Sequence, residues 1–236
     1  MDRYYEAYDA RYRTIHGKGL SWTADVPTPI VGEKLARYFP DPGAAVLELG
    51  CGEGRDARPL LAAGRNLTAA DVSPEAVAWC RAKDPSHGDR YRVLDCIRDP
   101  APGRWSFVYA VAVLHMLVEE PDRQAFLRFV RDCLLPGTGK ALLCSMGDGQ
   151  REFRTDPAEA FLPRLREHPT GPVTVAATSC RAVSFPTLRE ELKRAGLRVV
   201  EEGLTAAPPE FDCLMYAVAA PAADGDAPGC EEESHA

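Results

Sequence analysis

Three glycines separated by single residues, Gly50, Gly52 and Gly54, stand where a short apolar run ends. Glycine adopts positive φ without strain and carries no Cβ, so such a turn lets the main chain lie directly against a flat or branched ligand. The dinucleotide fingerprint G-x-G-x-x-G would need glycine where this chain has Arg55, and no G-x-x-x-x-G-K-[ST] phosphate loop occurs. The turn therefore predicts a closely bound ligand that is not a pyrophosphate.

Acidic residues stand in or at the ends of three apolar runs, each able to accept hydrogen bonds from a ligand. Glu48 precedes the glycine turn, where its carboxylate would repel phosphate and could attract an ammonium group, directly or through water. Asp71 follows about 20 residues later, where an acid can accept both hydroxyls of a ribose. Asp95 could accept from an exocyclic amine such as adenine N6, while the N–H of Cys96 serves a ring nitrogen. An amine, a ribose and an adenine together describe S-adenosylmethionine.

Short apolar runs alternate with amphipathic stretches through the middle of the chain, a pattern typical of strand–helix–strand units and a mainly parallel sheet. In such a sheet ligands bind beyond the carboxyl ends of the strands, where the glycine turn and the acids would meet. The last two runs can pair as a hairpin. We predict strands over 44–50, 66–72, 91–96, 139–146, 197–205 and 212–220, a strand with its following loop over 105–117, and helices over 55–64, 73–83, 123–134 and 187–196.

Four segments in this order resemble the motifs of class I S-adenosylmethionine-dependent methyltransferases: ELGCGEGRDA, DVSPEAV, LDC and FVYAVAVLHML. The likeness covers 44–146 and implies a Rossmann-like, doubly wound α/β fold. That fold has a seven-stranded, mainly parallel sheet with an antiparallel C-terminal hairpin strand and helices on both faces. The resemblance also implies S-adenosylmethionine as cofactor and S-adenosylhomocysteine as product. The cofactor-binding residues that it implies are Glu48, Gly50, Cys51, Gly52, Gly54, Asp71, Val72, Asp95, Cys96, Ala110 and Val111.

Two features depart from this family's pattern. Many relatives carry an acid at the entry to the fourth strand, where this chain has Ser106, and the N-P-P-[YFW] signature is absent. The second departure disfavours methylation of adenine N6 or cytosine N4 in nucleic acids. Taken singly, Asp71 and Asp95 could instead be turn or cap aspartates that bond to nearby backbone.

The N-terminal stretch YYEAYDARYRTIHGKGLSWTADVPTPIV has tyrosines at helical spacing and ends in W-x-x-x-x-P-x-P. It resembles the leader of small-molecule methyltransferases that act on thiols, thiopurines and tellurite, in which a helix folds over the cofactor. This implies that Trp22 packs near the methionine part and that Tyr12 reaches its carboxylate, with which Arg55 could also pair. The alternatives are an amphipathic helix merely packed on the sheet and an exposed surface arginine. His16 and His168 are expected to be solvated loop histidines.

Methyl transfer from a sulfonium is a direct displacement, so the protein must align a nucleophile behind the methyl and exclude water. A general base is needed only where the nucleophile is protonated. His115 follows the expected fourth strand, where the family resemblance places side chains near the methyl, and histidine titrates near neutral pH. We predict it as the catalytic base; the alternative is a structural histidine bonded at the strand exit.

The interval 147–182 is rich in charge, proline and threonine, which suits a connecting insertion that covers the site better than another sheet layer. Its five arginines could select an anionic substrate if they face the pocket, or could lie on a solvated surface. We therefore expect an N-terminal helical cap over 1–40, a cofactor-binding domain over 41–220 that includes the insertion, and a disordered acidic tail over 221–236.

Composition narrows the class of function. The chain has 236 residues and a net charge of −7, which opposes a polyanionic partner, so we expect no nucleic acid. Without a long apolar run or a secretion signal, we expect a cytoplasmic protein that does not contact membranes. The eight cysteines stand singly, so we expect no metal site. We predict a monomeric or homodimeric methyltransferase for O, N or S of a small molecule; the alternatives are modification of the cofactor itself, or a non-catalytic cofactor sensor.

Overall fold

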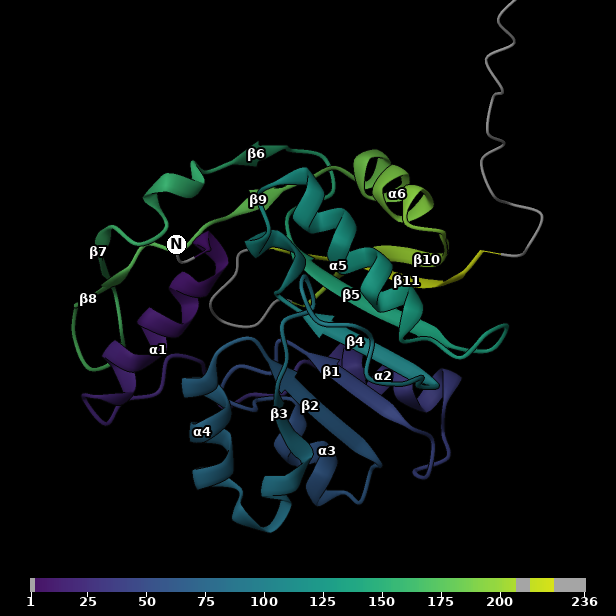
Figure 1. Cartoon of the computed structure of the whole chain (residues 1–236), viewed down its shortest axis with the longest axis horizontal. Helices are drawn as coiled ribbons and strands as arrows, with labels where there is room; N and C mark the ends of the chain where they lie inside the picture. The colour runs from purple at the N-terminus through teal and green to yellow at the C-terminus, as the bar shows by residue number, and fades with distance from the viewer. Residues whose placement is uncertain (1–2, 207–212, 223–236) are drawn as a thin grey trace, which may run out of the picture.

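A central seven-stranded sheet organises the protein in the computed structural model, which describes residues 3–206 and 213–222 (Figure 1). The strands are β1 (Val46–Leu49), β2 (Leu67–Asp71), β3 (Tyr91–Val93), β4 (Phe107–Val111), β5 (Lys140–Met146), β10 (Leu197–Thr205) and β11 (Leu214–Pro221). They lie in the order β10–β11–β5–β4–β1–β2–β3. Strand β11 is antiparallel to β5 and β10, and the remaining neighbours are parallel. The predicted Rossmann-like α/β class is confirmed, including its antiparallel hairpin strand.

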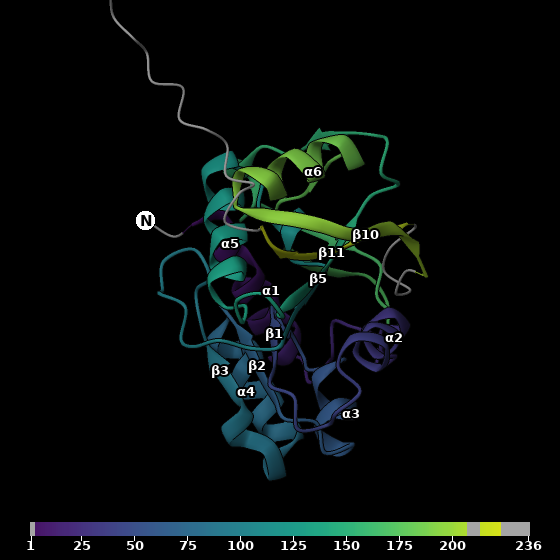
Figure 2. The same ribbon diagram turned by 90° about the vertical axis from the view of Figure 1, so that its right-hand side faces the viewer.

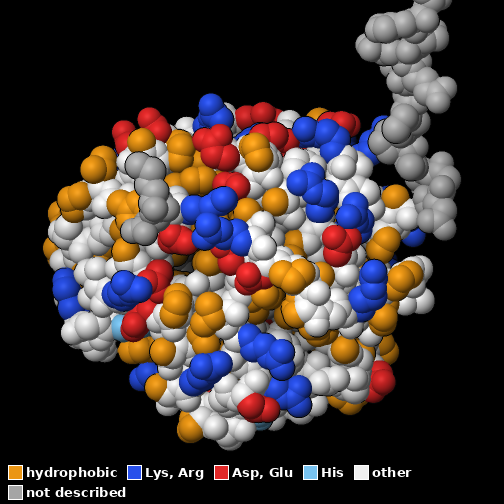
Figure 3. All heavy atoms as spheres, in the orientation of Figure 1, with side chains coloured by type: hydrophobic (Ala, Val, Ile, Leu, Met, Phe, Trp, Pro, Cys, Tyr) orange, Lys and Arg blue, Asp and Glu red, His pale blue; other side chains and the backbone are white. Residues whose placement is uncertain are grey.

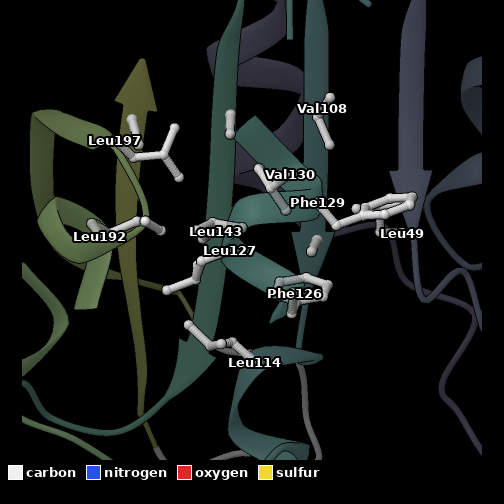
Figure 4. Packing of buried hydrophobic residues seen from close by; sticks show 14 of the residues in the cluster. Leu49, Val108, Leu114, Phe126, Leu127, Phe129, Val130, Leu143, Leu192 and Leu197 are labelled. Atoms are coloured by element: carbon white, nitrogen blue, oxygen red, sulfur yellow. The ribbon is translucent and has the colours of Figure 1, made fainter. Parts of the chain in front are cut away.

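Helices cover both faces of the sheet. They are α2 (Pro29–Tyr38), α3 (Ala57–Ala62) and α4 (Pro74–Lys83) on one face, and α5 (Glu120–Asp132) and α6 (Phe185–Arg194) on the other. Figure 2 shows α2 and α3 across the sheet from α5. Strand residues such as Leu49 and Leu143 pack against Phe126 and Val130 of α5 and Leu192 of α6 (Figure 4). Because both faces are covered, β1 and β4 are apolar nearly throughout.

Local capping signals set where the helices begin. The Ser73 hydroxyl accepts from the N–H of Ala76 at 3.0 Å and starts α4, as predicted. Helix α6 begins ahead of its predicted start because Ser184 caps it by accepting from the N–H of Thr187. Helix α5 also begins early, with Pro121 in its first turn, a position where proline loses no hydrogen bond. Helices α5 and α6 therefore start two or three residues before their predicted starts, and the predicted sheet is unaffected.

The strand order reverses between β1 and β4, and the glycine turn lies at that point. Strand β1 pairs with β2 on one side and with β4 on the other. The N–H groups of Gly50 and Cys51 both donate to the Ala70 carbonyl, at 2.7 and 2.9 Å. In open α/β sheets this reversal creates the crevice in which ligands bind. The turn after β1 is therefore fixed beside the end of β2.

The N-terminal segment forms a 3-10 turn, η1 (Tyr4–Glu6), and a helix, α1 (Ala7–His16), beside α4. The insertion is more regular than expected. It holds two small antiparallel ladders, β6 (Phe153–Arg154) with β9 (Arg181–Ala182), and β7 (Pro163–Arg166) with β8 (Val173–Ala176), separated by the 3-10 turn η4 (Pro157–Glu159). Alternation in the β8 sequence VTVA buries Val173 and Val175 against Ile15 of α1, which explains the second ladder.

The remaining elements are two 3-10 turns, η2 (Pro85–Arg90) and η3 (Leu114–Met116). None of the helices in the described part of the chain is both long and apolar enough to cross a membrane. The predicted tail at 221–236 lies outside the described residues from 223 onward, and its first residue, Pro221, ends β11.

Candidate functional site

A cavity of about 970 Å³ opens beyond the carboxyl ends of β1, β2 and β4, between α1 and the insertion. That volume is typical of sites for small molecules and cofactors. Two of the residues predicted to bind the cofactor do not line it: Ala110 packs in the core, and Gly54 lies near Cys80 and Arg58. The predicted residues that do line it are Tyr12, Trp22, Glu48, Gly50, Cys51, Gly52, Arg55, Asp71, Val72, Asp95, Cys96, Val111 and His115.

The glycine turn has the backbone conformation that its sequence predicts. Gly50, Gly52 and Gly54 have φ of 73°, 52° and 79°, a region that side chains rarely adopt. A Cβ at Gly50 would overlap the Val113 side chain, and one at Gly52 would lie 2.7 Å from the Tyr12 hydroxyl. The turn is thus kept bare both by its backbone conformation and by the residues packed on it.

Asp71, at the end of β2, ties the turn to the sheet. Its carboxylate accepts from the N–H of Gly52 and from the N–H of Ser73, each at 2.8 Å. Burial raises the pKa of Asp71, and the Ser73 and Gly52 donors partly offset that effect. Each carboxylate oxygen can still accept a second hydrogen bond. Asp71 therefore does bond to nearby backbone, as the turn-aspartate alternative predicts. Its carboxylate nevertheless lines the cavity and can still accept hydrogen bonds from a ligand.

Asp95 is reached by the N-terminal segment, a contact that sequence reasoning missed. The hydroxyl of Tyr5 donates to Asp95 at 3.0 Å, and the N–H of Ile97 donates to its other oxygen at 2.9 Å. Tyr5 is buried and lines the cavity. The helical spacing of the N-terminal tyrosines indicates that Tyr5 could be buried, but no feature of the nearby sequence indicates that it contacts the loop after β3. The N-terminal segment thus spans the site from Tyr12, on the glycine turn, to the loop after β3.

Glu48 and Arg55 are both withdrawn from solvent. Burial raises the pKa of Glu48 well above its usual range, and the nearby Asp56 carboxylate adds to the shift. The Glu48 Oε2 atom is buried and has no hydrogen-bond partner among the described residues. The Arg55 side chain is 10% exposed and its Nε lies 3.6 Å from Asp56, so it is not the exposed surface arginine of the alternative prediction.

His115 lies on η3, buried and facing the cavity. Burial lowers its pKa to about 3, and the Arg123 cation contributes. The imidazole is therefore neutral near pH 7. A neutral imidazole can accept a proton or a hydrogen bond, although a conjugate acid with so low a pKa makes it a weak base.

Glu53, between Gly52 and Gly54 of the glycine turn, is the main residue that sequence reasoning missed. Its side chain is 2% exposed and accepts from the Trp22 and Thr23 N–H groups, at 2.7 and 2.8 Å. The hydroxyls of Ser21 and Thr23 also donate to it, at 2.7 and 2.8 Å. Burial would raise the pKa of Glu53, but the Thr23 and Trp22 donors lower it overall. The glycine turn is thereby fastened to the segment that covers it.

His16 is not the solvated histidine that was predicted. Its ring nitrogens lie 2.9 Å from carboxylate oxygens of Glu53 and Glu75, and its side chain is 4% exposed. The ring stacks on Trp79 with centroids 3.9 Å apart. His168 also has partners, since its Nε2 lies 2.8 Å from the Ser21 carbonyl. Contacts between distant parts of the chain bury His16, whereas His168 keeps the partly exposed loop position that was expected for it.

The described residues contain no group of three His, Cys, Asp or Glu side chains placed to hold a metal. The seven cysteines among the described residues are free thiols, and four of them are buried: Cys51, Cys80, Cys133 and Cys144.

Comparisons with known proteins agree with this arrangement. Residues 46–139 match the model of a family described as "Methyltransferase domain". A ubiquinone biosynthesis O-methyltransferase of Xanthomonas axonopodis pv. citri (strain 306) is 31% identical over 134 residues, which cover 53% of this chain and 55% of that protein. A second, from Xanthomonas oryzae pv. oryzae (strain PXO99A), is 31% identical over 161 residues, 62% of this chain and 66% of its own. The chain thus spans about half to two thirds of the length of these curated relatives.

Solved structures support the fold. The CcbJ methyltransferase from Streptomyces caelestis aligns with a TM-score of 0.67 at 23% identity, over 91% of this chain and 99% of that one. The Burkholderia thailandensis 1,6-didemethyltoxoflavin-N1-methyltransferase, solved with bound 1,6-didemethyltoxoflavin and S-adenosylhomocysteine, aligns with a TM-score of 0.64 at 20% identity, over 93% and 89% of the two chains. At these identities the likeness establishes the shared fold.

Proposed function

The chain belongs to the class I S-adenosylmethionine-dependent methyltransferase family, and from that premise we propose that it moves the methyl of S-adenosylmethionine to an O, N or S atom of a small molecule. S-adenosylhomocysteine is the product. The observation that carries the proposal is the meeting of the glycine turn, Asp71 and Asp95 around one covered cavity. A site walled by α1 and the insertion suits a displacement that loses charge in its transition state and is favoured by the exclusion of water.

The residues present fit this cofactor. Asp71 retains acceptor capacity for ribose hydroxyls, while Asp95 and the Cys96 backbone suit an adenine edge. The buried, unbonded oxygen of Glu48 and the bare turn at Gly52 suit the amino-acid end, which is charged. Tyr12, Trp22 and Arg55 would bind the same end, and Gly50, Cys51, Val72 and Val111 would pack against the cofactor. When bound, the cofactor supplies an activated methyl on sulfur.

The protein's own contribution is positioning and exclusion of water. The segment from Tyr5 to Ala24 and the insertion both line the cavity, so they separate bound ligands from solvent. His115 would accept the acceptor's proton, or orient its nucleophilic atom, as a neutral imidazole. Because the rate of methyl transfer depends on how the acceptor is aligned with the methyl, the N-terminal segment and the insertion must hold both ligands in fixed positions.

A small acceptor is favoured over a nucleic acid by charge. The net charge is −7, and on the face seen in Figure 3 basic and acidic side chains are interspersed rather than gathered in a basic band. We also propose a cytoplasmic monomer or homodimer in which residues 1–40 form the cap of the domain over 41–220.

The test is calorimetry of the full chain with S-adenosylhomocysteine, followed by mass spectrometry with S-adenosylmethionine and a panel of hydroxyl, amine and thiol acceptors. Binding together with acceptor-dependent release of S-adenosylhomocysteine would support the proposal. Conversion of the cofactor without an acceptor would favour the cofactor-modifying alternative, and tight binding without turnover would favour the sensor.

A matched pair of variants tests the ribose role. Asp71→Ala should weaken S-adenosylhomocysteine binding by about 1 to 3 kcal/mol, the scale of lost charge-assisted hydrogen bonds. Asp89→Ala removes an acid whose side chain is 83% exposed, and it should leave binding unchanged. Equal affinity of both variants would remove Asp71 from the site.

A further inference from the structure

Two arginines far apart in the sequence converge on one backbone carbonyl inside the cavity. Nη2 of Arg11, on α1, donates to the Ala177 carbonyl at 2.8 Å, and Nη2 of Arg166, at the end of β7, donates to the same oxygen at 3.4 Å. Arg11 also donates to the Ala176 carbonyl and to the Thr178 hydroxyl, at 2.9 and 2.8 Å. Two guanidinium groups that share one acceptor atom are held close together.

Neither guanidinium forms an ion pair within the part of the chain that the structure describes. Two other arginines of the insertion, Arg164 and Arg181, do form ion pairs. Arg164 lies 3.5 Å from Glu159, and Arg181 lies 3.1 Å from Glu120. A neutral carbonyl does not cancel the repulsion between adjacent cations, so an anion placed beside both would be favoured.

The surroundings hold Arg11 in place. It is 5% exposed, and its guanidinium lies over the rings of Tyr8 and Trp22, 5.1 and 4.6 Å from their centroids. Burial lowers the pKa of Arg11, and Arg166 adds to that effect. Thr178 has a φ of 61°, an uncommon conformation for a residue other than glycine. Arg11, Arg166 and Thr178 all line the cavity. The charge of Arg11 is thus held in place and is reachable from the cavity, whereas Arg166 is an exposed residue at the cavity wall.

We propose that Arg11 and Arg166 form a subsite for a carboxylate of the methyl acceptor, which makes the preferred acceptor an anionic small molecule. The inference rests on the proposed methyltransferase function. A planar carboxylate suits guanidinium groups, which can bind it through paired hydrogen bonds. The Tyr8 ring beside Arg11 suits an acceptor whose carboxylate is attached to a flat, apolar body.

The cofactor's own carboxylate is the competing occupant, and helix geometry separates the two. The Tyr12 hydroxyl lies over Gly52, whereas Arg11 bonds to 176–178 of the insertion. Consecutive residues of an α-helix point about 100° apart. Arg11 therefore contacts the wall of the cavity formed by the insertion, whereas Tyr12 contacts the wall formed by the glycine turn.

The test uses benzoate, with neutral benzamide as its matched probe, titrated by calorimetry into the full chain saturated with S-adenosylhomocysteine. Wild-type protein should bind benzoate at least about tenfold more tightly than benzamide, and Arg166→Met should abolish that preference. Arg166→Lys, which keeps the charge without the fork, should retain part of it. Arg151→Met is the control, because that side chain is 90% exposed, does not line the cavity and should not affect either probe.

Three results would overturn the subsite: no preference for benzoate in the wild type, loss of the preference in Arg151→Met, or its retention in Arg166→Met. The affinity of Arg166→Met for S-adenosylhomocysteine is the second measurement. It should stay within about twofold of wild type, and a loss of tenfold or more would assign the arginines to the cofactor's carboxylate instead. Failure of the wild type to bind S-adenosylhomocysteine at all would reject the proposed function, which is a separate outcome.

Discussion

Arg123 of α5 and Glu191 of α6 form a fully buried ion pair, with hydrogen bonds of 2.8 and 2.6 Å between guanidinium and carboxylate. The same guanidinium donates to the carbonyls of Leu114 and Leu117, at 2.7 and 3.1 Å, on either side of His115. One cation therefore joins two helices and fixes the loop that carries the candidate base.

Glu191→Gln should lower the free energy of unfolding by about 3 to 5 kcal/mol, because it leaves the Arg123 charge buried without its partner. Urea unfolding followed by circular dichroism measures this change. Arg194→Met is the control, since it removes an arginine that is 46% exposed and should cost less than about 1 kcal/mol. Equal losses from both substitutions would show that the buried pair is no more important to stability than a surface one.

His115 should make the folded protein sensitive to acid. Its pKa in the folded state is about 3, below the ordinary value near 6.5. Since the unfolded chain takes up the proton first as pH falls, stability is present above pH 6.5 and is lost on acidification toward pH 3. His115→Asn, which does not titrate, should lose about 2 kcal/mol less than wild type between pH 7 and pH 5. Urea unfolding at both pH values tests this, and identical losses would mean that His115 is not held neutral.

Tyr4 and Tyr5 offer a matched comparison for the N-terminal segment. The Tyr5 hydroxyl donates to Asp95 in the site, whereas the Tyr4 hydroxyl donates to Asp122 on α5, at 2.8 Å. Tyr5→Phe should weaken S-adenosylhomocysteine binding roughly three- to tenfold, because it removes the hydrogen bond that orients the Asp95 carboxylate, which is expected to meet the adenine. Tyr4→Phe should leave binding unchanged. Calorimetry on both variants decides, and an equal effect from the two would argue against a specific role for Tyr5.

The fold was predictable because its determinants are local. Apolar runs marked the strands, and Ser73 with its following proline marked the start of α4 within the sequence itself. The order of the motifs, with Asp71 at the end of β2 and Asp95 in the loop after β3, was enough to bring most of the predicted site residues to one cavity. Where boundaries differ, as at α6, the cause is a capping residue: Ser184 lies three residues before the predicted start of the helix.

The contacts that close the site were not predictable, because they join residues far apart in the chain. Nothing near His16 indicates that Glu53 and Glu75 will flank it, so the sequence alone predicts a solvated histidine. The convergence of Arg11 and Arg166 depends in the same way on how α1 packs against β8. Sequence periodicity specifies which face of a helix is buried, but it does not specify the partner.

Glu53 should control how long the cofactor stays bound. Its carboxylate receives the Trp22 and Thr23 N–H groups together with His16, so the covering segment cannot lift without breaking several hydrogen bonds to one buried acid. Glu53→Gln preserves size but replaces one acceptor oxygen with an amide that faces the same donors. Stopped-flow displacement should then show S-adenosylhomocysteine leaving at least about tenfold faster, given the strength of hydrogen bonds to a charged group.

Glu75→Gln is the graded control for that experiment, because Glu75 is 32% exposed and also contacts the His16 ring. It should speed release only slightly. A dissociation rate that Glu53→Gln leaves at the wild-type value would mean that the covering segment opens without regard to Glu53. Faster release from both variants in equal measure would instead identify His16, which contacts both acids, as the residue that holds the segment closed.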